Sequence, residues 1–249
     1  MKLVHLVSAL GLVAMASSAH ATLLLTQNFD SCTLGAVAVS SCGVSGVSFS
    51  GDSAATALNV RAASDTINGS SLSATTFEGF FGAVTALNRF LVVGDISAGI
   101  NGEPNGQPGG ATSEVRFGLG MMTAGTHTLS FSFDYVFDTN AGSSVTSPDD
   151  FRVYLRDGSA AVVGTDVLFF GDTTQNSLTR RGTAFVQQTI TLSSATTLDL
   201  AFRLDEFNGQ NSSAVGIDNI RIESVPEPSI LALAGFGLVA LAARRRRTH

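Results

Sequence analysis

The side chains that could support catalysis are few in this 249-residue chain, and they are widely spaced. Of its four histidines, only His127 lies outside the two terminal segments. A single histidine excludes a zinc site built from several histidines, and a Ser-His-Asp arrangement would have to use this one residue. His127 stands at the polar start of an alternating segment, where we expect it to be solvated. The sequence therefore indicates a protein that is not an enzyme.

Two pairs of neighbouring carboxylates, Asp149-Asp150 and Asp205-Glu206, leave a secreted glycoside hydrolase as an alternative, because that reaction uses two carboxylates. Neighbouring residues on a strand point to opposite faces, so neither pair is well placed to flank one glycosidic bond. Ion pairing is the simpler role. We expect Asp199 and Asp205 to pair with arginines across an exposed sheet face.

Cys32 and Cys42 are the only cysteines of the chain. Two nearby thiols in an oxidising compartment are predicted to form a disulfide, which would stabilise the fold by about 2–3 kcal/mol. A metal site or a catalytic thiol would need partner residues that the sequence does not supply.

Tyr154 is the one tyrosine predicted to lie on a polar strand face, which it shares with Arg152 and Arg156. An aromatic ring with a polar group is a common element of sugar recognition. The chain has no tryptophan, and Tyr135 falls on the apolar face of its segment. Tyr154, Arg152 and Arg156 are therefore the candidate ligand-binding residues, and a lectin-like carbohydrate-binding module is an alternative function.

These residues must be positioned by β-strands, because apolar and polar residues alternate in many segments between residues 22 and 223. The segments predicted as strands are 23–29, 45–50, 56–61, 86–93, 114–120, 126–137, 151–156, 162–170, 183–192, 198–205 and 214–223. No comparable amphipathic helix is present. Short strands separated by Gly, Ser, Asn and Asp predict an all-β fold, an antiparallel β-sandwich or jelly roll. The segment Asn101 to Gly110 is predicted to be a surface loop.

The alternation changes phase between Ile217 and Ile220, which predicts a β-bulge at Asp218-Asn219. Together with Asn28-Phe29-Asp30, this pattern resembles the first and last strands of jelly-roll carbohydrate-binding and MAM-like modules. The resemblance implies a structural calcium shared by Asp30 and Asp218, since carboxylates are suitable calcium ligands. Ordinary turn aspartates account for the pattern equally well, and no other cofactor is expected.

The charge distribution argues against nucleic acid as a partner. The only lysine is Lys2, and four of the thirteen arginines are Arg244, Arg245, Arg246 and Arg247. Residues 22–223 hold nine arginines and 19 acidic residues, which gives a net charge of −10. Because phosphate recognition depends on Lys and Arg, we expect no nucleic-acid binding.

The N-terminal residues 1–21 have the three parts of a secretory signal peptide. Lys2 supplies the positive charge, an apolar stretch follows, and Ala19-His20-Ala21 is a small-residue cleavage site. An uncleaved N-terminal anchor is the alternative, but the apolar run is short for a membrane span. We expect export across the inner membrane and cleavage after Ala21.

The C-terminal residues 225–249 combine two prolines, an apolar run and a cluster of arginines. The run Ile230 to Ala243 would make a helix of about 21 Å, shorter than a hydrocarbon core of about 30 Å. Four adjacent arginines are expected to hold its end in the cytoplasm. The prolines Pro226 and Pro228 stop the helix upstream.

Pro226-Glu227-Pro228, the short apolar run and Arg244 to Arg247 together resemble the PEP-CTERM sorting signal of Gram-negative bacteria that make exopolysaccharide. The resemblance implies recognition by an exosortase, a membrane-embedded transpeptidase-like protease, and cleavage near Pro226-Glu227-Pro228. A plain short anchor is the alternative interpretation.

Together these features predict three parts: a signal peptide (1–21), a β-sandwich ectodomain (22–224) and a sorting signal (225–249). The expected protein is a non-catalytic matrix or surface protein associated with exopolysaccharide and biofilm. Its expected partners are the secretion machinery, the exosortase, the membrane before processing, and exopolysaccharide. The expected final location is the cell surface or the extracellular space.

Overall fold

A computed structural model describes residues 21–37, 42–43, 46–51, 58–62, 88–94, 111–139, 149–171, 178–206 and 213–225. The signal peptide up to residue 20, the segment Asn101 to Gly110 and the sorting signal from Pro226 onward lie outside these residues. Within the described residues, no helix is long and apolar enough to cross a membrane.

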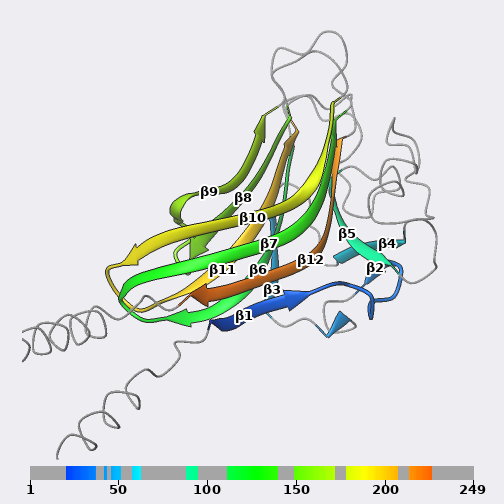
Figure 1. Cartoon of the computed structure of the whole chain (residues 1–249). Coiled ribbons are helices and arrows are strands. Elements are labelled where there is room, and N and C mark those ends of the chain that lie inside the picture. The colour runs from blue at the N-terminus through cyan, green and yellow to red at the C-terminus, as the bar shows by residue number, and fades with distance from the viewer. Residues whose placement is uncertain are drawn as a thin grey trace, which may run out of the picture.

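Twelve β-strands make up the described fold (Figure 1). They are β1 (Thr22–Gln27), β2 (Gly35–Val37), β3 (Val47–Gly51), β4 (Leu58–Ala62), β5 (Arg89–Gly94), β6 (Ala111–Met122), β7 (Gly125–Thr139), β8 (Asp150–Asp157), β9 (Val162–Gly171), β10 (Leu178–Leu192), β11 (Thr196–Glu206) and β12 (Ser213–Val225). Each predicted strand segment overlaps one of them, and the three-residue β2 is the addition. The prediction of an all-β fold is confirmed.

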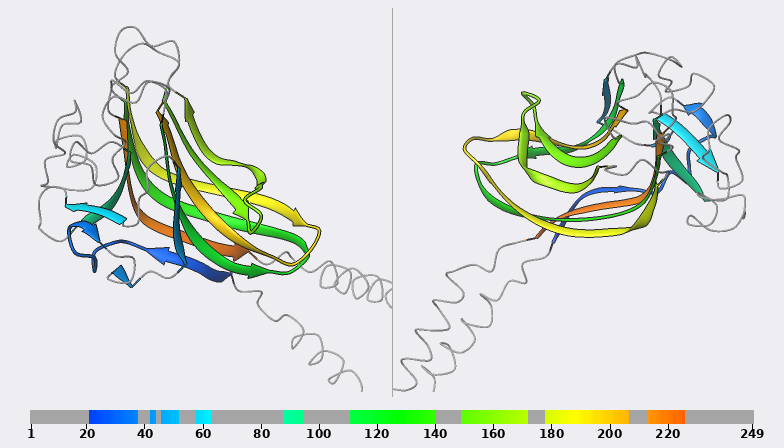
Figure 2. Two further views of the ribbon diagram at one scale, coloured as in Figure 1. Left: turned by 180° about the vertical axis from the view of Figure 1, so that it is seen from behind. Right: turned by 90° about the horizontal axis from the view of Figure 1, so that it is seen from above.

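The strands form two antiparallel sheets that pack face to face. The seven-stranded sheet has the order β10-β7-β12-β5-β4-β2, and β1 pairs with β12 beside β5. The five-stranded sheet has the order β3-β6-β11-β8-β9. Figure 2 shows the longest strands, β7 and β10, as curved ribbons along the outside of the sandwich. The sandwich predicted from the alternating pattern is therefore present.

Aromatic side chains from both sheets interlock at the centre of the sandwich. Phe202 on β11 makes edge-to-face contacts with Phe117 on β6 and Phe133 on β7, at ring-centroid distances of 5.9 and 5.3 Å. Phe117 also meets Phe29, which follows β1, at 6.2 Å. Such contacts add about 0.5–1.5 kcal/mol each to the burial of the rings. The ring of Phe29 thereby anchors the end of β1 to the five-stranded sheet.

The bulge predicted at Asp218-Asn219 is confirmed. The pairing between β12 and β7 shifts register between Asp218 and Arg221. Asn219 has a φ of 51°, a left-handed conformation that Asn tolerates better than most residues because its short side chain can bond locally. The shift lets Ile217 and Ile220 both face the core.

The disulfide between Cys32 and Cys42 is also confirmed, with a Cα–Cα distance of 4.3 Å. Both cysteines are buried beside Phe29 in the hydrophobic core. The cross-link therefore ties the segment after β1 to the sandwich.

The two ends of the sandwich differ in how the strands are connected. At one end, short turns join β6 to β7 (residues 123–124), β8 to β9 (residues 158–161) and β10 to β11 (residues 193–195). We call this the short-turn end. β1 begins and β12 ends there as well, because Thr22 pairs with Ser224. β7, β9 and β11 end at the opposite end, and β8, β10 and β12 begin there. The residues that connect these strands lie largely outside the described ranges.

Candidate functional site

The outer face of the five-stranded sheet holds the candidate ligand-binding residues. Alternate residues of β8 point outward there, including Arg152, Tyr154 and Arg156, while Val153 and Leu155 are buried in the core. The pairing of the strands places Arg203 of β11 beside Arg152. Glu114 of β6 lies beside Arg203 in turn.

Glu114 is the centre of this face. Its side chain is fully buried although it points away from the core, and it forms ion pairs with Arg116 and Arg156. The Arg156 pair has an Nη1–Oε1 distance of 2.7 Å. The hydroxyl of Tyr154 donates a hydrogen bond to the second carboxylate oxygen of Glu114. Two arginines and a phenol thus compensate one buried charge.

Tyr154 is accordingly not an exposed platform, because only 3% of its surface is accessible. Burial, and after it the neighbouring Glu114 carboxylate, raises the pKa of the Tyr154 hydroxyl above its ordinary value. Within this face Tyr154 is a packed and hydrogen-bonded side chain. Its role as a glycan contact stays a prediction.

A second ion pair continues the face along β11. Arg203 donates from Nε to both oxygens of Asp205, at 2.9 and 2.8 Å. The hydroxyl of Thr112 donates to the same carboxylate at 2.7 Å. The Asp205 carboxylate holds the pKa of the Arg203 guanidinium above its usual value. Asp205 therefore pairs with an arginine as expected, but the arginine lies two residues away on the same strand and not across the sheet.

Arg152 supplies the more open part of the face. It donates to Asp166 on β9 with N–O distances of 3.0 and 3.1 Å. Its guanidinium also lies 5.7 Å from the ring centre of Tyr154 and 5.8 Å from that of Phe169. Phe169 is 51% exposed, so it is the open aromatic ring beside the predicted residues.

Sequence analysis did not single out Phe169 or Glu114. Phe169 lies in the run Val167-Leu168-Phe169-Phe170. Every residue of this run is apolar, so the pattern does not indicate which side chains face solvent. Glu114 falls on the polar phase of β6, which periodicity interprets as solvent-exposed. Arg156 and Tyr154, which contact its carboxylate, come from β8, so a local pattern on β6 could not find it.

Asp30 and Asp218, the predicted calcium ligands, lie near one another at the bulge of β12. Burial raises the pKa of Asp218 to about 7, and the negative charges of Asp30 and Asp134 add to the rise. Asp218 is 1% exposed and accepts a hydrogen bond from the backbone N–H of Asn219 at 2.7 Å. Ionising the buried Asp218 carboxyl group costs free energy, and a bound cation would lower that cost.

The oxygens of Asp30 already have protein donors. The backbone N–H of Arg89 and the side-chain amide of Asn28 donate to them, at 3.2 and 3.1 Å. Among the described residues, no group of three or more His, Cys, Asp or Glu side chains is arranged to hold a metal ion. Calcium binding therefore stays a prediction.

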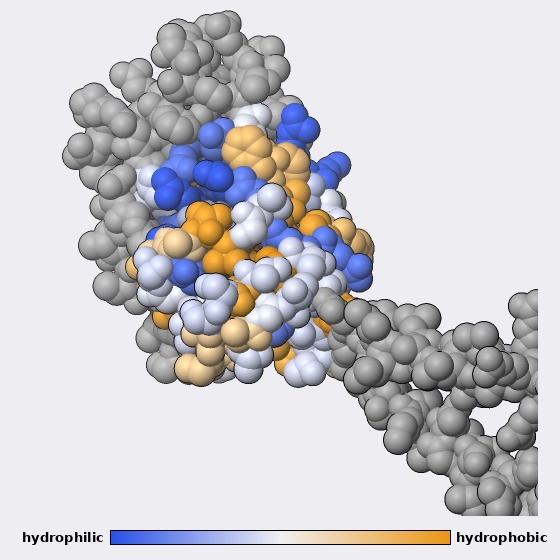
Figure 3. All heavy atoms as spheres, turned by 90° about the vertical axis from the view of Figure 1, so that its left-hand side faces the viewer, coloured by the Kyte–Doolittle hydropathy of each residue, from blue (hydrophilic) through white to orange (hydrophobic). Residues whose placement is uncertain are grey.

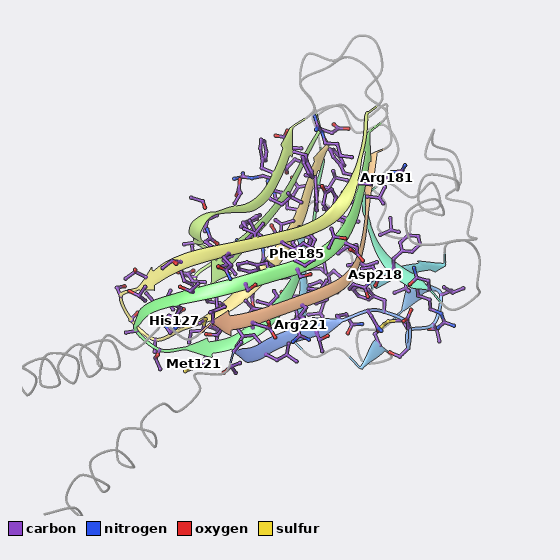
Figure 4. The ribbon with its side chains drawn as sticks, viewed as in Figure 1. Met121, His127, Arg181, Phe185, Asp218 and Arg221 are labelled. Atoms are coloured by element: carbon purple, nitrogen blue, oxygen red, sulfur yellow. A yellow bond between two sulfur atoms is a disulfide. The ribbon has the colours of Figure 1, made fainter. Side chains whose placement is uncertain are left out.

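A polar groove of about 460 Å³ lies next to this bulge, on the outer face of the seven-stranded sheet. It is lined by Thr26, Gln27, Asn28, Ser132, Asn219, Ile220 and Arg221. Figure 4 shows Arg221, Asp218 and Phe185 on this side of the molecule. Phe185 is 78% exposed on β10, the edge strand of the sheet.

Of the residues considered for catalysis, the carboxylates come together but the histidine lies apart from them. Asp150 on β8 lies directly opposite Asp205 on β11. The ring Nε2 of His127 donates to the carbonyl oxygen of Thr123 at 2.8 Å, at the short-turn end. Asp149, Asp150 and Asp205 lie toward the opposite end, where β8 begins and β11 ends. His127 is thus remote from the carboxylates that an enzyme would pair with it.

Comparison with known proteins identifies the C-terminal segment. Residues 224–247 match the PEP-CTERM protein-sorting motif. The match begins in the last two residues of β12, so the motif follows the folded sandwich directly. A motif of this kind implies export and a membrane-anchored sorting stage. No protein with a curated description matches the chain.

Three solved structures illustrate what the sandwich is similar to. The CBM22-1 xylan-binding domain from Paenibacillus barcinonensis Xyn10C is 15% identical, with a TM-score of 0.34; the match covers 85% of this chain and 99% of that one. The mannan-recognising module TmCBM27 is 11% identical, with a TM-score of 0.37 and coverages of 84% and 100%. The K3 cleaved adhesin domain of Lys-gingipain from Porphyromonas gingivalis is 15% identical, with a TM-score of 0.35 and coverages of 81% and 98%. At these scores the likeness carries no inference about what the present chain binds.

Proposed function

We propose that the chain is an exported, non-catalytic surface or matrix protein that an exosortase processes at its C-terminal motif and that associates with exopolysaccharide. The observation that carries the proposal is the PEP-CTERM motif at residues 224–247. In the precursor, the apolar run after the motif holds the protein at the membrane. After processing, the sandwich reaches the cell surface or the extracellular space.

The limits of the folded part support two cleavages. β1 begins at Thr22, directly after the predicted signal-peptide cleavage site, and β12 ends at Val225, directly before Pro226. Removal of both terminal segments leaves every strand intact. A cut upstream of Val225 would instead remove part of β12, which lies between β7 and the pair β1 and β5. The motif therefore lies where cleavage does not damage the fold.

The arrangement of ionisable groups supports a non-catalytic role. Glu114 and Asp205, the buried carboxylates on the outer face of the five-stranded sheet, are both bound by arginines. A carboxylate whose oxygens are held by guanidinium groups is already engaged in charge-assisted hydrogen bonds within the protein. These residues stabilise the sheet face instead.

Mass spectrometry of the protein from its natural host tests the sorting proposal. We expect the wild-type protein to begin at Thr22 and to end near residue 226. The Pro226→Ala variant should keep the C-terminal arginines and stay in the membrane fraction. An intact C-terminus in the wild-type protein would exclude exosortase processing.

Polysaccharide binding on the outer face of the five-stranded sheet is the second candidate function. The observation that favours it is the guanidinium of Arg152 beside the exposed ring of Phe169. A flat ring next to charge-bearing hydrogen-bond donors suits a sugar, which offers both C–H faces and hydroxyls.

Affinity electrophoresis against the host's own exopolysaccharide tests this second function. We expect Phe169→Ala to increase mobility in the polysaccharide gel, and Phe185→Ala, which changes an exposed ring on the other sheet, to leave mobility unchanged. Tyr154→Phe keeps the packing and removes the hydrogen bond to Glu114. It therefore distinguishes a loss of polysaccharide binding from a loss of folding stability. Equal mobility of wild type and Phe169→Ala would exclude the site.

A further inference from the structure

The short-turn end carries almost no formal charge, in contrast to the rest of the sandwich. It consists of residues 22–23, 121–127, 158–161, 191–197 and 224–225, which contain no Asp, Glu, Lys or Arg. The ionisable group within it is His127. The ectodomain as a whole has a net charge of −10, so an uncharged end of this size is a distinct region of the surface.

This end is exposed and partly apolar. Met121 is 76% exposed and Leu23 is 47% exposed, and the turn residues 123–124 and 193–195 are exposed threonine, alanine and serine. Figure 3 views the molecule from this side, and the lower part of that face is coloured white to orange, with most of the blue above it. Figure 4 places Met121 and His127 at this end, away from Arg181 and Asp218.

The predicted signal peptide and the C-terminal apolar run are both attached to the sandwich at the short-turn end. Thr22, the first residue of β1, pairs with Ser224 near the end of β12. The predicted signal peptide precedes Thr22, and the apolar run starting at Ile230 follows Val225. The two membrane-directed segments of the precursor therefore join the sandwich side by side.

The link between the sandwich and the apolar run is short. Five residue steps separate Val225 from Ile230, so they span at most about 18 Å when fully extended. The headgroup layer on each side of a bilayer takes up several ångströms of that length. The distance left between the sandwich and the headgroup surface is therefore close to the Debye length, which is about 8 Å at physiological ionic strength.

From these observations we propose that the short-turn end is a lipid-facing surface, which lies against the bilayer while the apolar run is inserted. The proposal rests on the proposed function, because the sorting signal is what holds the precursor at the membrane. Acidic groups within a Debye length of anionic headgroups would be repelled. Charges close to the low-dielectric interior would also lose solvation. Hydroxyls, alanine and exposed Met121 and Leu23 avoid both costs.

The nearest charged residues on the neighbouring strands fit this boundary. Glu223 lies two residues before Val225 and is paired with Arg221. On the five-stranded sheet, Asp157 directly precedes the β8–β9 turn and lies opposite Leu198, and Asp199 lies two residues beyond Thr197. Charged residues are thus present just beyond the short-turn end.

Fluorescence quenching by lipids tests the proposal on the full chain, reconstituted in phosphatidylcholine and phosphatidylglycerol vesicles that contain a headgroup-labelled quencher lipid. An environment-sensitive dye is attached to Thr123→Cys or to Ser194→Cys at the short-turn end. Phe185→Cys, an exposed position in the middle of a strand, is the control. We expect strong loss of fluorescence at positions 123 and 194 and none above background at position 185.

Charge at the end should then move it away from the lipid. Met121→Glu in the chain labelled at position 123 should reverse most of the quenching, and Phe185→Glu should not, although the two native side chains are 76% and 78% exposed. Equal quenching at positions 123 and 185 would overturn the proposal. Flotation of the vesicles reports insertion independently, so a chain that fails to float contradicts the membrane-held precursor itself, whereas a chain that floats without selective quenching contradicts only the lipid-facing end.

Discussion

On the outside of the five-stranded sheet, charged side chains bury one another, whereas on the outside of the seven-stranded sheet hydroxyl groups stay exposed to solvent. Glu114 is enclosed by Arg116, Arg156 and Tyr154. The corresponding region of the other sheet has cross-strand threonine pairs, such as Thr128 with Thr189 at an oxygen–oxygen distance of 3.0 Å. The same alternating sequence pattern therefore produces two surfaces with different energetics.

The difference shows that a polar strand position is not equivalent to an exposed one. Arginine side chains are long enough to cover a neighbouring carboxylate with their apolar stems and satisfy it with their guanidinium groups. Threonines are too short to cover anything beyond the pair that they form. We expect mutations to cost stability on the first surface and to cost little on the second.

The largest effect should come from Glu114→Gln. This change removes the carboxylate that Arg116 and Arg156 share in a buried cluster, and removing one partner of a buried ion pair costs about 3–5 kcal/mol. Urea unfolding measures the loss. The matched control is Glu223→Gln, which breaks the exposed pair with Arg221 and should cost less than about 1 kcal/mol. Equal losses would show that the two faces do not differ.

Asp218 is the exception on the seven-stranded sheet, because it is a buried acid with a pKa raised to about 7. The folded state keeps its proton while the unfolded state loses it near pH 4, so stability falls as pH rises from about 4 to about 7. The total loss is on the order of 3 kcal/mol. Asp218→Asn should flatten this decline when unfolding is measured from pH 4 to pH 8.

The same residue tests the predicted calcium. Bound calcium would stabilise the charged form of Asp218, so millimolar calcium should restore the stability of the wild-type protein at pH 8 and not that of Asp218→Asn. Identical unfolding curves with calcium and with a chelator would exclude the site at Asp30 and Asp218.

Removal of the disulfide supplies a reference that is independent of both outer faces, because Cys32 and Cys42 lie in the core. The double variant Cys32→Ser, Cys42→Ser should lose about 2–3 kcal/mol in the loop-entropy description. When the double cysteine variant is combined with Glu114→Gln, the two losses of unfolding free energy should add, since the structure shows no contact between the two sites. A strongly non-additive result would mean that the charged face and the N-terminal region unfold together.

The smallest effect is expected for Thr128→Val. It removes one hydroxyl of an exposed cross-strand pair and keeps a β-branched side chain, so the free energy of unfolding should change by less than about 0.5 kcal/mol. Thermal unfolding followed by circular dichroism is sensitive enough to set this limit. A loss as large as that of Glu114→Gln would remove the distinction between the two outer faces.

Much of the fold could be predicted from the sequence because its physical cause is local. Alternation with period two marks a strand that is buried on one side, as in β7, and a change of phase marks the bulge at Asp218. The two cysteines could be paired because no third cysteine competes. The order of the strands could not be predicted, since it depends on which distant segments pair.

The outer face of the five-stranded sheet shows where such reasoning ends. Arg152, Tyr154 and Arg156 can be assigned to one face from the sequence because they alternate along one strand. The burial of Tyr154 depends on Glu114 and on arginines of other strands, which periodicity does not address. Phe169 was missed because its strand is apolar on both faces around that position.

The pairing of β1 with β12 also determines how the protein would bear a mechanical load. A product that stayed attached through Val225 would be pulled along the axis of β12, which is hydrogen-bonded to β7 on one side and to β1 and β5 on the other. Force along a strand loads all of its hydrogen bonds in shear, whereas force across a strand breaks them one at a time. The attachment point therefore lies at the end of a strand that is hydrogen-bonded along both of its edges.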